Sequence, residues 1–251
     1  MIKKLAYSII FLGLLESIIY FQKSNIILII ACVLLFLLSI VSSVRLKALQ
    51  KIGFWGQVNI SILPLSYILS TSVFLFFIPE LFNLQQIYIA LVVIIFYGAL
   101  KLVDNVCKDI NSRKSFKTCD FLITISAFLF YSSIFGMYLF LKWPSWIFLI
   151  LLALVTFILT YEFFWHNMLL KKHIVYSLIL TLIISEISWA LTLWPTGFLP
   201  RSMVIFAVFY AFTTLSKHNF NKTLNKKTVI SIIIISIIML CLALLTTQWE
   251  F

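Results

Sequence analysis

Nine long apolar runs follow one another along the chain, separated by short polar connections. A helix that spans a bilayer needs about 20 mostly apolar residues, and most of the runs approach that length. Because open sheets cannot lie in lipid and barrel strands are about half as long, the runs predict spanning helices. The eighth run is the shortest, so its ends are the least defined. The runs cover residues 5–22, 25–44, 54–78, 85–102, 119–141, 145–166, 174–194, 201–216 and 228–248.

The basic residues predict how the chain is threaded, because inner connections of membrane proteins carry an excess of Lys and Arg. With the N-terminus inside, only Lys23, Lys142 and Arg201 fall in outer connections, and every other Lys and Arg falls in an inner one. The Trp-Pro pairs at 143–144 and 194–195 lie in predicted outer turns, at the headgroup level that Trp favours. We therefore expect an all-α, polytopic integral membrane helix bundle of about nine transmembrane helices, with the N-terminus inside and the C-terminus outside.

Composition supports lipid as the main solvent of the chain. Of its 251 residues 63% are hydrophobic and 11% are charged, whereas a soluble domain has about 45–50% apolar and about 25% charged residues. The basic inner connections explain the net charge of +11, and no nucleic-acid-binding motif is present, so nucleic acid is not an expected partner. Membrane lipids are expected partners, because the basic connections suit anionic headgroups. No connection is long enough for a soluble domain, which predicts a single transmembrane domain over residues 1–251.

Two acids lie at membrane depth in this sequence. Glu186 is roughly 18 Å from the inner end of the seventh run, and Glu16 is roughly 16 Å from the inner end of the first. Trp189, three residues after Glu186, shares its helix face. Since no Lys or Arg lies at that depth, we expect at least one carboxyl to be neutral or to face water. Such a group either handles a proton or cation, or forms a hydrogen bond between helices.

The third run adds an amide, Asn59, to this set. Pro64 is expected to kink the same helix, because it has no N–H to give to the carbonyl of Ile60. Broken helices form transporter sites, although proline is also common in membrane helices for packing reasons. Asn59 is therefore grouped with Glu186, Glu16 and Trp189 as a candidate intramembrane polar site.

At the inner end of the sixth run, Glu162 and His166 are four residues apart and lie on one helix face. The pair is a candidate for proton handling, but two ligands are too few for a structural metal site. Interfacial snorkelling with an electrostatic contact is the preferred interpretation. The chain has no HExxH, no GxSxG, no glycine-rich phosphate loop and no CxxC pair. No catalytic residue, metal or cofactor is predicted, and enzyme activity is left open.

The seventh to ninth runs carry a loose E-x-x-W…W-P pattern, formed by Glu186, Trp189 and Trp194-Pro195 and followed by a last run that ends in Thr-Thr-Gln-Trp. In this pattern the C-terminal third resembles an uncharacterised family of bacterial polytopic membrane proteins of unknown function. The resemblance implies no activity and adds weight to Glu186 and Trp189 as a unit. The expected location is a cell membrane, namely a bacterial inner or plasma membrane.

Three functional hypotheses follow. A permease-like protein would use Glu186, Glu16 and Asn59 and needs a hydrated path that reaches Glu186. A non-catalytic membrane subunit or scaffold would use its acids to hold helices together, with other membrane proteins as partners. A lipid-modifying enzyme would use Glu162 and His166 in a groove at the interface. The sequence supports the first two equally and the third less, and it names no substrate.

Overall fold

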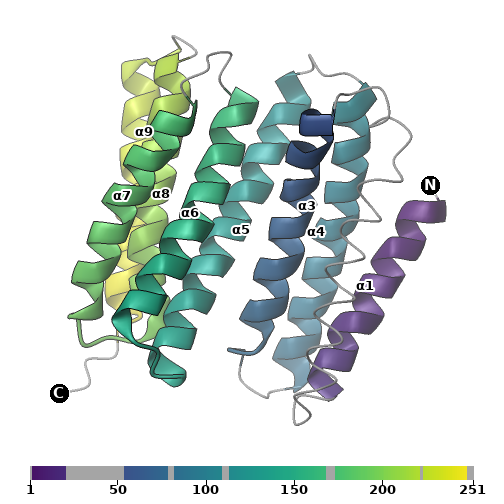
Figure 1. Cartoon of the computed structure of the whole chain (residues 1–251), viewed down its shortest axis with the longest axis horizontal. Coiled ribbons are helices and arrows are strands. Elements are labelled where there is room, and N and C mark those ends of the chain that lie inside the picture. The colour runs from purple at the N-terminus through teal and green to yellow at the C-terminus, as the bar shows by residue number, and fades with distance from the viewer. Residues whose placement is uncertain are drawn as a thin grey trace. The chain divides into compact units, whose positions relative to one another are not determined.

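The computed structural model describes residues 2–20, 54–78, 82–108, 113–167, 173–220 and 223–247. All regular structure in these ranges is α-helical, which confirms the predicted all-α class (Figure 1). A helix satisfies its own backbone N–H and C=O groups, which is what an apolar surrounding demands. The eight described helices are α1 (Ile2–Tyr20), α3 (Phe54–Leu75), α4 (Phe82–Lys108), α5 (Arg113–Phe140), α6 (Ser145–Asn167), α7 (His173–Thr192), α8 (Phe198–Phe220) and α9 (Lys226–Leu245).

Six of the described helices, α4 to α9, contain stretches long and apolar enough to cross a membrane, so the chain is a multi-pass membrane protein. In α1 and α3 the apolar stretches are shorter, Leu5–Ser17 and Pro64–Leu75. The predicted run at 25–44 lies outside the described residues, and both the nine-helix count and the orientation stay predictions. The eighth run is longer than the predicted 201–216: α8 begins three residues earlier, at Phe198, continues through polar residues after 216, and reaches 23 residues.

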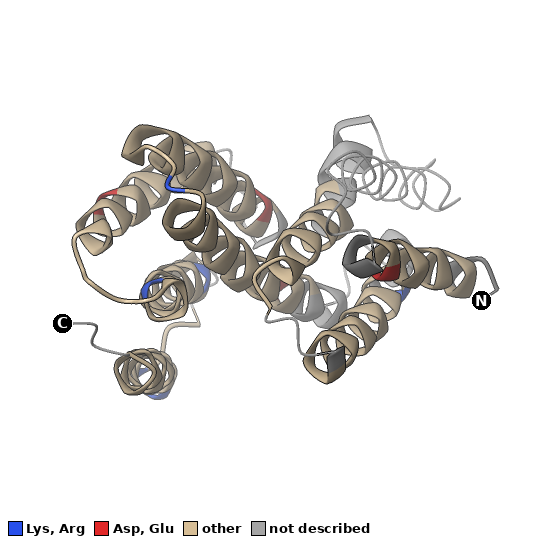
Figure 2. Ribbon diagram, turned by 90° about the horizontal axis from the view of Figure 1, so that it is seen from below, with Lys and Arg blue, Asp and Glu red and all other residues tan. Residues whose placement is uncertain are grey.

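Contacts divide the chain into two compact units, residues 1–126 and 127–251, with the boundary inside α5. In the first unit, α4 packs against both α1 and α3. The rings of Phe11 and Phe96 lie 4.6 Å apart between centroids, and the Tyr67 hydroxyl donates to the Val92 carbonyl at 3.1 Å. Charged side chains are sparse along these helices (Figure 2). That the two units form one domain is untested.

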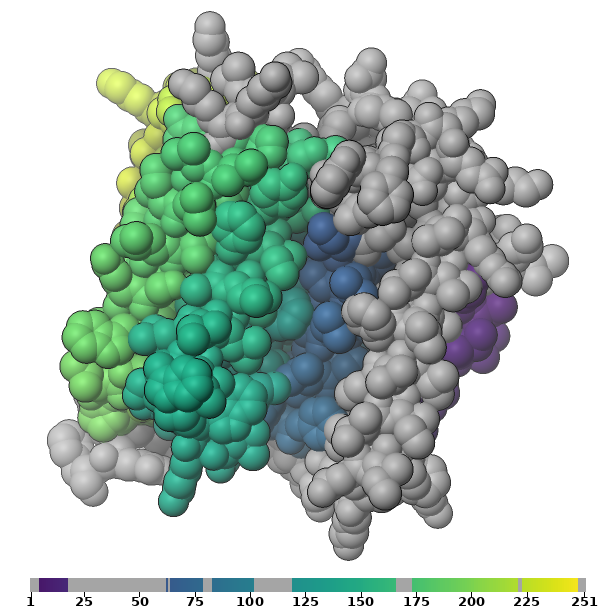
Figure 3. Space-filling view, viewed as in Figure 1, coloured from purple at the N-terminus to yellow at the C-terminus, as the bar shows by residue number. Residues whose placement is uncertain are grey.

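In the second unit, α6 packs against α7 and α8, and α8 also packs against α7 and α9. Figure 3 shows the side chains of α6 and α7 packed closely together. The second half of α5 joins this unit through aromatic pairs, including Phe135 with Phe148, whose ring centroids are 5.0 Å apart. Within α9 only Ile232 and Ala243 are buried, so most of this helix presents apolar side chains to lipid.

Candidate functional site

Helix α7 places Glu186 and Trp189 on a surface that no other described helix covers. Glu186 is exposed, and so are Leu182 and Trp189, which show 59% and 57% of their surface. The opposite face is buried and includes Leu180 and Ile184. Glu186 forms no hydrogen bond or ion pair with any other residue that the structure describes. Its carboxyl therefore lies on an outward, apolar face of α7 and not in a cavity between the described helices.

Glu16 and Asn59, the other two predicted polar groups, belong to the first compact unit. Glu16 is half-buried in α1, beside Ser17, whose hydroxyl donates to the Leu14 carbonyl at 2.7 Å. Because Glu16 and Glu186 lie in different units, a meeting of the two acids is untested. Asn59 lies in α3, which runs through Pro64. Its side chain is outside the described residues.

Glu162 and His166 lie one turn apart in α6. Glu162 is only 1% exposed, so its carboxyl is packed inside the helix bundle. The interfacial position of the Glu162–His166 pair stays a prediction. The His166 side chain is outside the described residues. Close by, the Tyr161 ring meets the His173 ring edge to face, with centroids 5.1 Å apart, and joins α6 to α7. No group of three or more His, Cys, Asp or Glu that could hold a metal ion occurs in the described ranges.

Buried hydroxyl groups connect α5 to its neighbours. The Ser132 hydroxyl donates to Ser202 of α8 at 2.9 Å, and both side chains are fully buried. One residue earlier, the Tyr131 hydroxyl lies 3.3 Å from that of Thr156 in α6. Hydrogen bonds of this kind hold membrane helices together, since lipid offers a hydroxyl no alternative partner. These four residues are part of the polar interior of the second unit.

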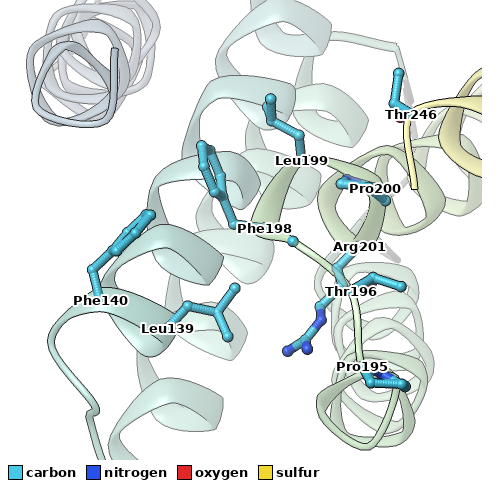
Figure 4. A pocket seen from close by; sticks show the side chains of 10 residues that line it. Leu139, Phe140, Pro195, Thr196, Phe198, Leu199, Pro200, Arg201 and Thr246 are labelled. Carbon is cyan, nitrogen blue, oxygen red and sulfur yellow. The ribbon is translucent and has the colours of Figure 1, made fainter. Parts of the chain in front are cut away.

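A pocket of about 500 Å³ opens at the end of the second unit where α5 ends and α8 begins (Figure 4). We call it the Arg201 pocket. Its walls are mainly apolar, with α5, the turn between α7 and α8, the first turn of α8 and the end of α9 all contributing. The lining includes Leu139, Phe140, Thr196, Phe198, Arg201 and Thr246.

Among the described residues that line this pocket, Arg201 is the only cationic one, and it is 5% exposed. Its Nη2 atom donates to the Trp194 carbonyl, which fixes the guanidinium beside the turn. The Nε and Nη1 atoms are buried and have no hydrogen-bond partner. The hydroxyl of Thr196, itself 7% exposed, is also buried without a partner. In Figure 4 the Arg201 side chain extends into the space between Leu139 and Pro195.

The turn that carries Thr196 is built by its own backbone. The Leu193 and Trp194 N–H groups donate to the carbonyls of Ala190 and Leu191, which closes the end of α7. The Thr196 N–H then donates to the Trp194 carbonyl at 2.8 Å. Since Arg201 donates to the same carbonyl, this oxygen ties the turn to the first turn of α8.

A family described as "Protein of unknown function (DUF5656)" matches residues 3–246, nearly the whole chain. The chain belongs to the DUF5656 family. This confirms the predicted membership of an uncharacterised family of unknown function. No curated protein and no solved structure matches the chain. The DUF5656 description assigns no activity, so function has to be argued from the residues.

Two features of this DUF5656 protein escaped the sequence analysis. The sequence predicts that Arg201 is one of three basic residues in outer connections, and nothing in it indicates that the side chain is buried. The hydroxyls of Ser132 and Ser202 were also missed, because isolated serines are common in membrane helices and only a structure shows which ones meet.

Proposed function

We propose that this DUF5656 protein is a non-catalytic subunit of a cell-membrane complex. In this proposal α7 packs against a transmembrane helix of a different protein and covers Glu186. The observation that carries the proposal is the position of Glu186 on an exposed apolar face, between exposed Leu182 and Trp189. The topology that accompanies it has nine spans, with the N-terminus inside and the C-terminus outside.

The chemistry of the partner follows from the cost of leaving the acid in lipid. An ionised side chain at the bilayer centre costs about 2.5–3.5 kcal/mol on insertion scales. This chain has no Lys or Arg at the depth of Glu186, and the described residues give the carboxyl no partner. A partner helix with a Lys or Arg at that depth removes the cost through an ion pair. Ala190, exposed and one turn from Glu186, lets that helix come close.

The alternatives need a different surrounding for their acids. A permease requires water to reach Glu186, and the exposed apolar neighbours of Glu186 favour a protein contact over a hydrated path. A lipid-modifying enzyme requires Glu162 and His166 in an open groove, and the burial of Glu162 disfavours that arrangement. For these reasons we favour the subunit hypothesis over both.

A photo-reactive amino acid at Leu182 tests the proposal in the native membrane. The matched control is the same amino acid at Ile237, an exposed position on α9 with 52% of its surface accessible. Each position is tested in the wild-type background and with Glu186→Leu. Glu186→Leu removes the acid from an exposed apolar face and breaks no described contact, so the chain should stay folded. Adducts are identified by peptide sequencing in a mass spectrometer.

We expect one discrete adduct from Leu182, to a transmembrane peptide that carries a Lys or Arg, and none from Ile237. The adduct should be lost in the Glu186→Leu background. An adduct with a second copy of this chain, or one that survives Glu186→Leu, contradicts the proposal. An absent adduct, together with carbodiimide modification of Glu186 that fades as pH rises, would instead favour the permease hypothesis.

A further inference from the structure

We propose that the Arg201 pocket binds a phosphate group, held by the Arg201 guanidinium, the Thr196 hydroxyl and the first turn of α8. This site is independent of Glu186. All the residues that form it belong to the second compact unit, and all lie in described ranges. The phosphate belongs either to a lipid headgroup or to a small free phosphate.

The first argument is the unbalanced charge. Burying an ionised group is costly unless it is paired and hydrogen-bonded. Arg201 is 95% buried by its accessible surface, yet two of its three guanidinium nitrogens have no acceptor among the described residues, and none of the described residues that line the pocket is acidic. A bound anion supplies both the missing acceptors and the missing charge.

The second argument is that the unpaired donors belong to separate groups. The Thr196 hydroxyl is a second buried polar group without a partner on the same pocket. The first turn of α8 lies between Thr196 and Arg201, and a helix N-terminus favours negative charge. Donors from a guanidinium, a hydroxyl and a helix end suit an anion with several oxygens. A phosphate offers more acceptor oxygens than a carboxylate does.

The third argument is the shape and place of the pocket. Its volume of about 500 Å³ lies in the range of small-molecule sites and exceeds a phosphate alone. The apolar walls around Leu139, Phe140 and Phe198 suit the carbon atoms attached to the phosphate. The adjoining Trp194-Pro195 turn is of the kind found at the headgroup level of a bilayer, where lipid phosphates lie.

The test uses the full chain, purified and delipidated in a maltoside detergent, which contains no phosphate. Thermal unfolding is measured at constant ionic strength in two arms. One arm replaces chloride with inorganic phosphate, and the other adds short-chain phosphatidylglycerol or the diacylglycerol of equal chain length. The variants are Arg201→Gln and Thr196→Val, the second of which keeps the size of the side chain. Lys142→Gln is the matched control, because it removes one positive charge from an exposed residue in the nearby turn after α5.

We expect phosphatidylglycerol to raise the Tm of the wild type and of Lys142→Gln alike, and diacylglycerol to have no effect. This holds whether or not inorganic phosphate also raises the Tm in its own arm. The apparent Kd should weaken about tenfold or more in Arg201→Gln, because a hydrogen-bonded charge is lost, and by a smaller factor in Thr196→Val. Stabilisation by phosphatidylglycerol alone identifies a lipid headgroup. Stabilisation by inorganic phosphate identifies a site that also accepts a free phosphate.

Two results overturn the proposal. The first is the absence of stabilisation by either phosphate compound. The second is equal stabilisation of the wild type and Arg201→Gln. If Arg201→Gln does not fold, equal apparent Kd values for Thr196→Val and Lys142→Gln count as the same result.

Discussion

The hydrogen bond between Ser132 of α5 and Ser202 of α8 gives a stability prediction that can be worked from the structure. Ser132 donates to Ser202 at 2.9 Å, and Ser202 donates in turn to the Leu199 carbonyl at 2.7 Å. Ser132→Ala therefore removes one donor but leaves Ser202 with an acceptor. Ser202→Ala removes the acceptor that Ser132 uses. Each single variant is expected to lose about 0.5–1.5 kcal/mol of unfolding free energy, the net value of a typical hydrogen bond.

The double variant measures the bond itself. When Ser202 is absent, the Ser132 hydroxyl can turn to a carbonyl of its own helix, as Ser133 does with the Leu129 carbonyl at 2.7 Å. This fallback limits the coupling energy, and we expect about 0.6 kcal/mol, with about 1.7 kcal/mol as an upper bound for such pairs in membranes.

The assay is reversible unfolding in mixed micelles, with the free energy of unfolding compared across the wild type, both single variants and the double variant. Ser133→Ala combined with Ser202→Ala is the control, because Ser133 bonds within its own helix, and its coupling should lie within the additivity error of about 0.3–0.5 kcal/mol. A Ser132–Ser202 coupling no larger than that of the control pair would refute the claim that this bond joins α5 to α8.

Two further predictions concern packing and topology. Phe11→Ala should destabilise the protein by up to about 3 kcal/mol, because Phe11 is fully buried against Phe96. Leu12→Ala is the control and should change the free energy of unfolding little, because Leu12 is exposed. Equal losses of unfolding free energy in mixed micelles would contradict the described packing of α1 on α4. The topology test uses a variant without the four native cysteines. A membrane-impermeant maleimide added outside should label Ser145→Cys but not Thr223→Cys, because three helices, α6, α7 and α8, separate the two positions. Labelling of both from one side, or of Thr223→Cys alone, would contradict the predicted threading.

Much of the fold could be predicted because lipid imposes a length on each element. The runs at 145–166 and 174–194 correspond to α6 (Ser145–Asn167) and α7 (His173–Thr192) within two residues at each end. The run at 201–216 was too short at its C-terminal end because hydropathy stops before Lys217, while helical backbone bonding does not; at its N-terminal end it left out Phe198 to Pro200, which begin α8. Arg201 and Lys217 both continue α8, the first by turning inward to the Trp194 carbonyl.

The site was harder to predict because an apolar run has no amphipathic face. On α7, Leu180 is buried and Leu182 is exposed, although the residues are identical. The sequence therefore predicts a depth for Glu186 without saying which way the side chain points. For Arg201 the sequence does not predict burial. That burial depends on the contact between its guanidinium and the turn at 193–197, which no local pattern encodes.

Glu186 and Arg201 are two charged groups of the second unit with opposite signs, and they still do not pair with one another. Glu186 lies eight residues before Trp194, which at 1.5 Å per residue is about 12 Å along α7 from the end where Arg201 is anchored. It also points outward, whereas Arg201 is enclosed. The two proposals therefore give each charge its own partner from outside the described residues: a cationic helix at membrane depth for the acid, and an anion at the helix ends for the base. Because these partners differ in charge, depth and size, loss of one in a variant should leave the other unchanged.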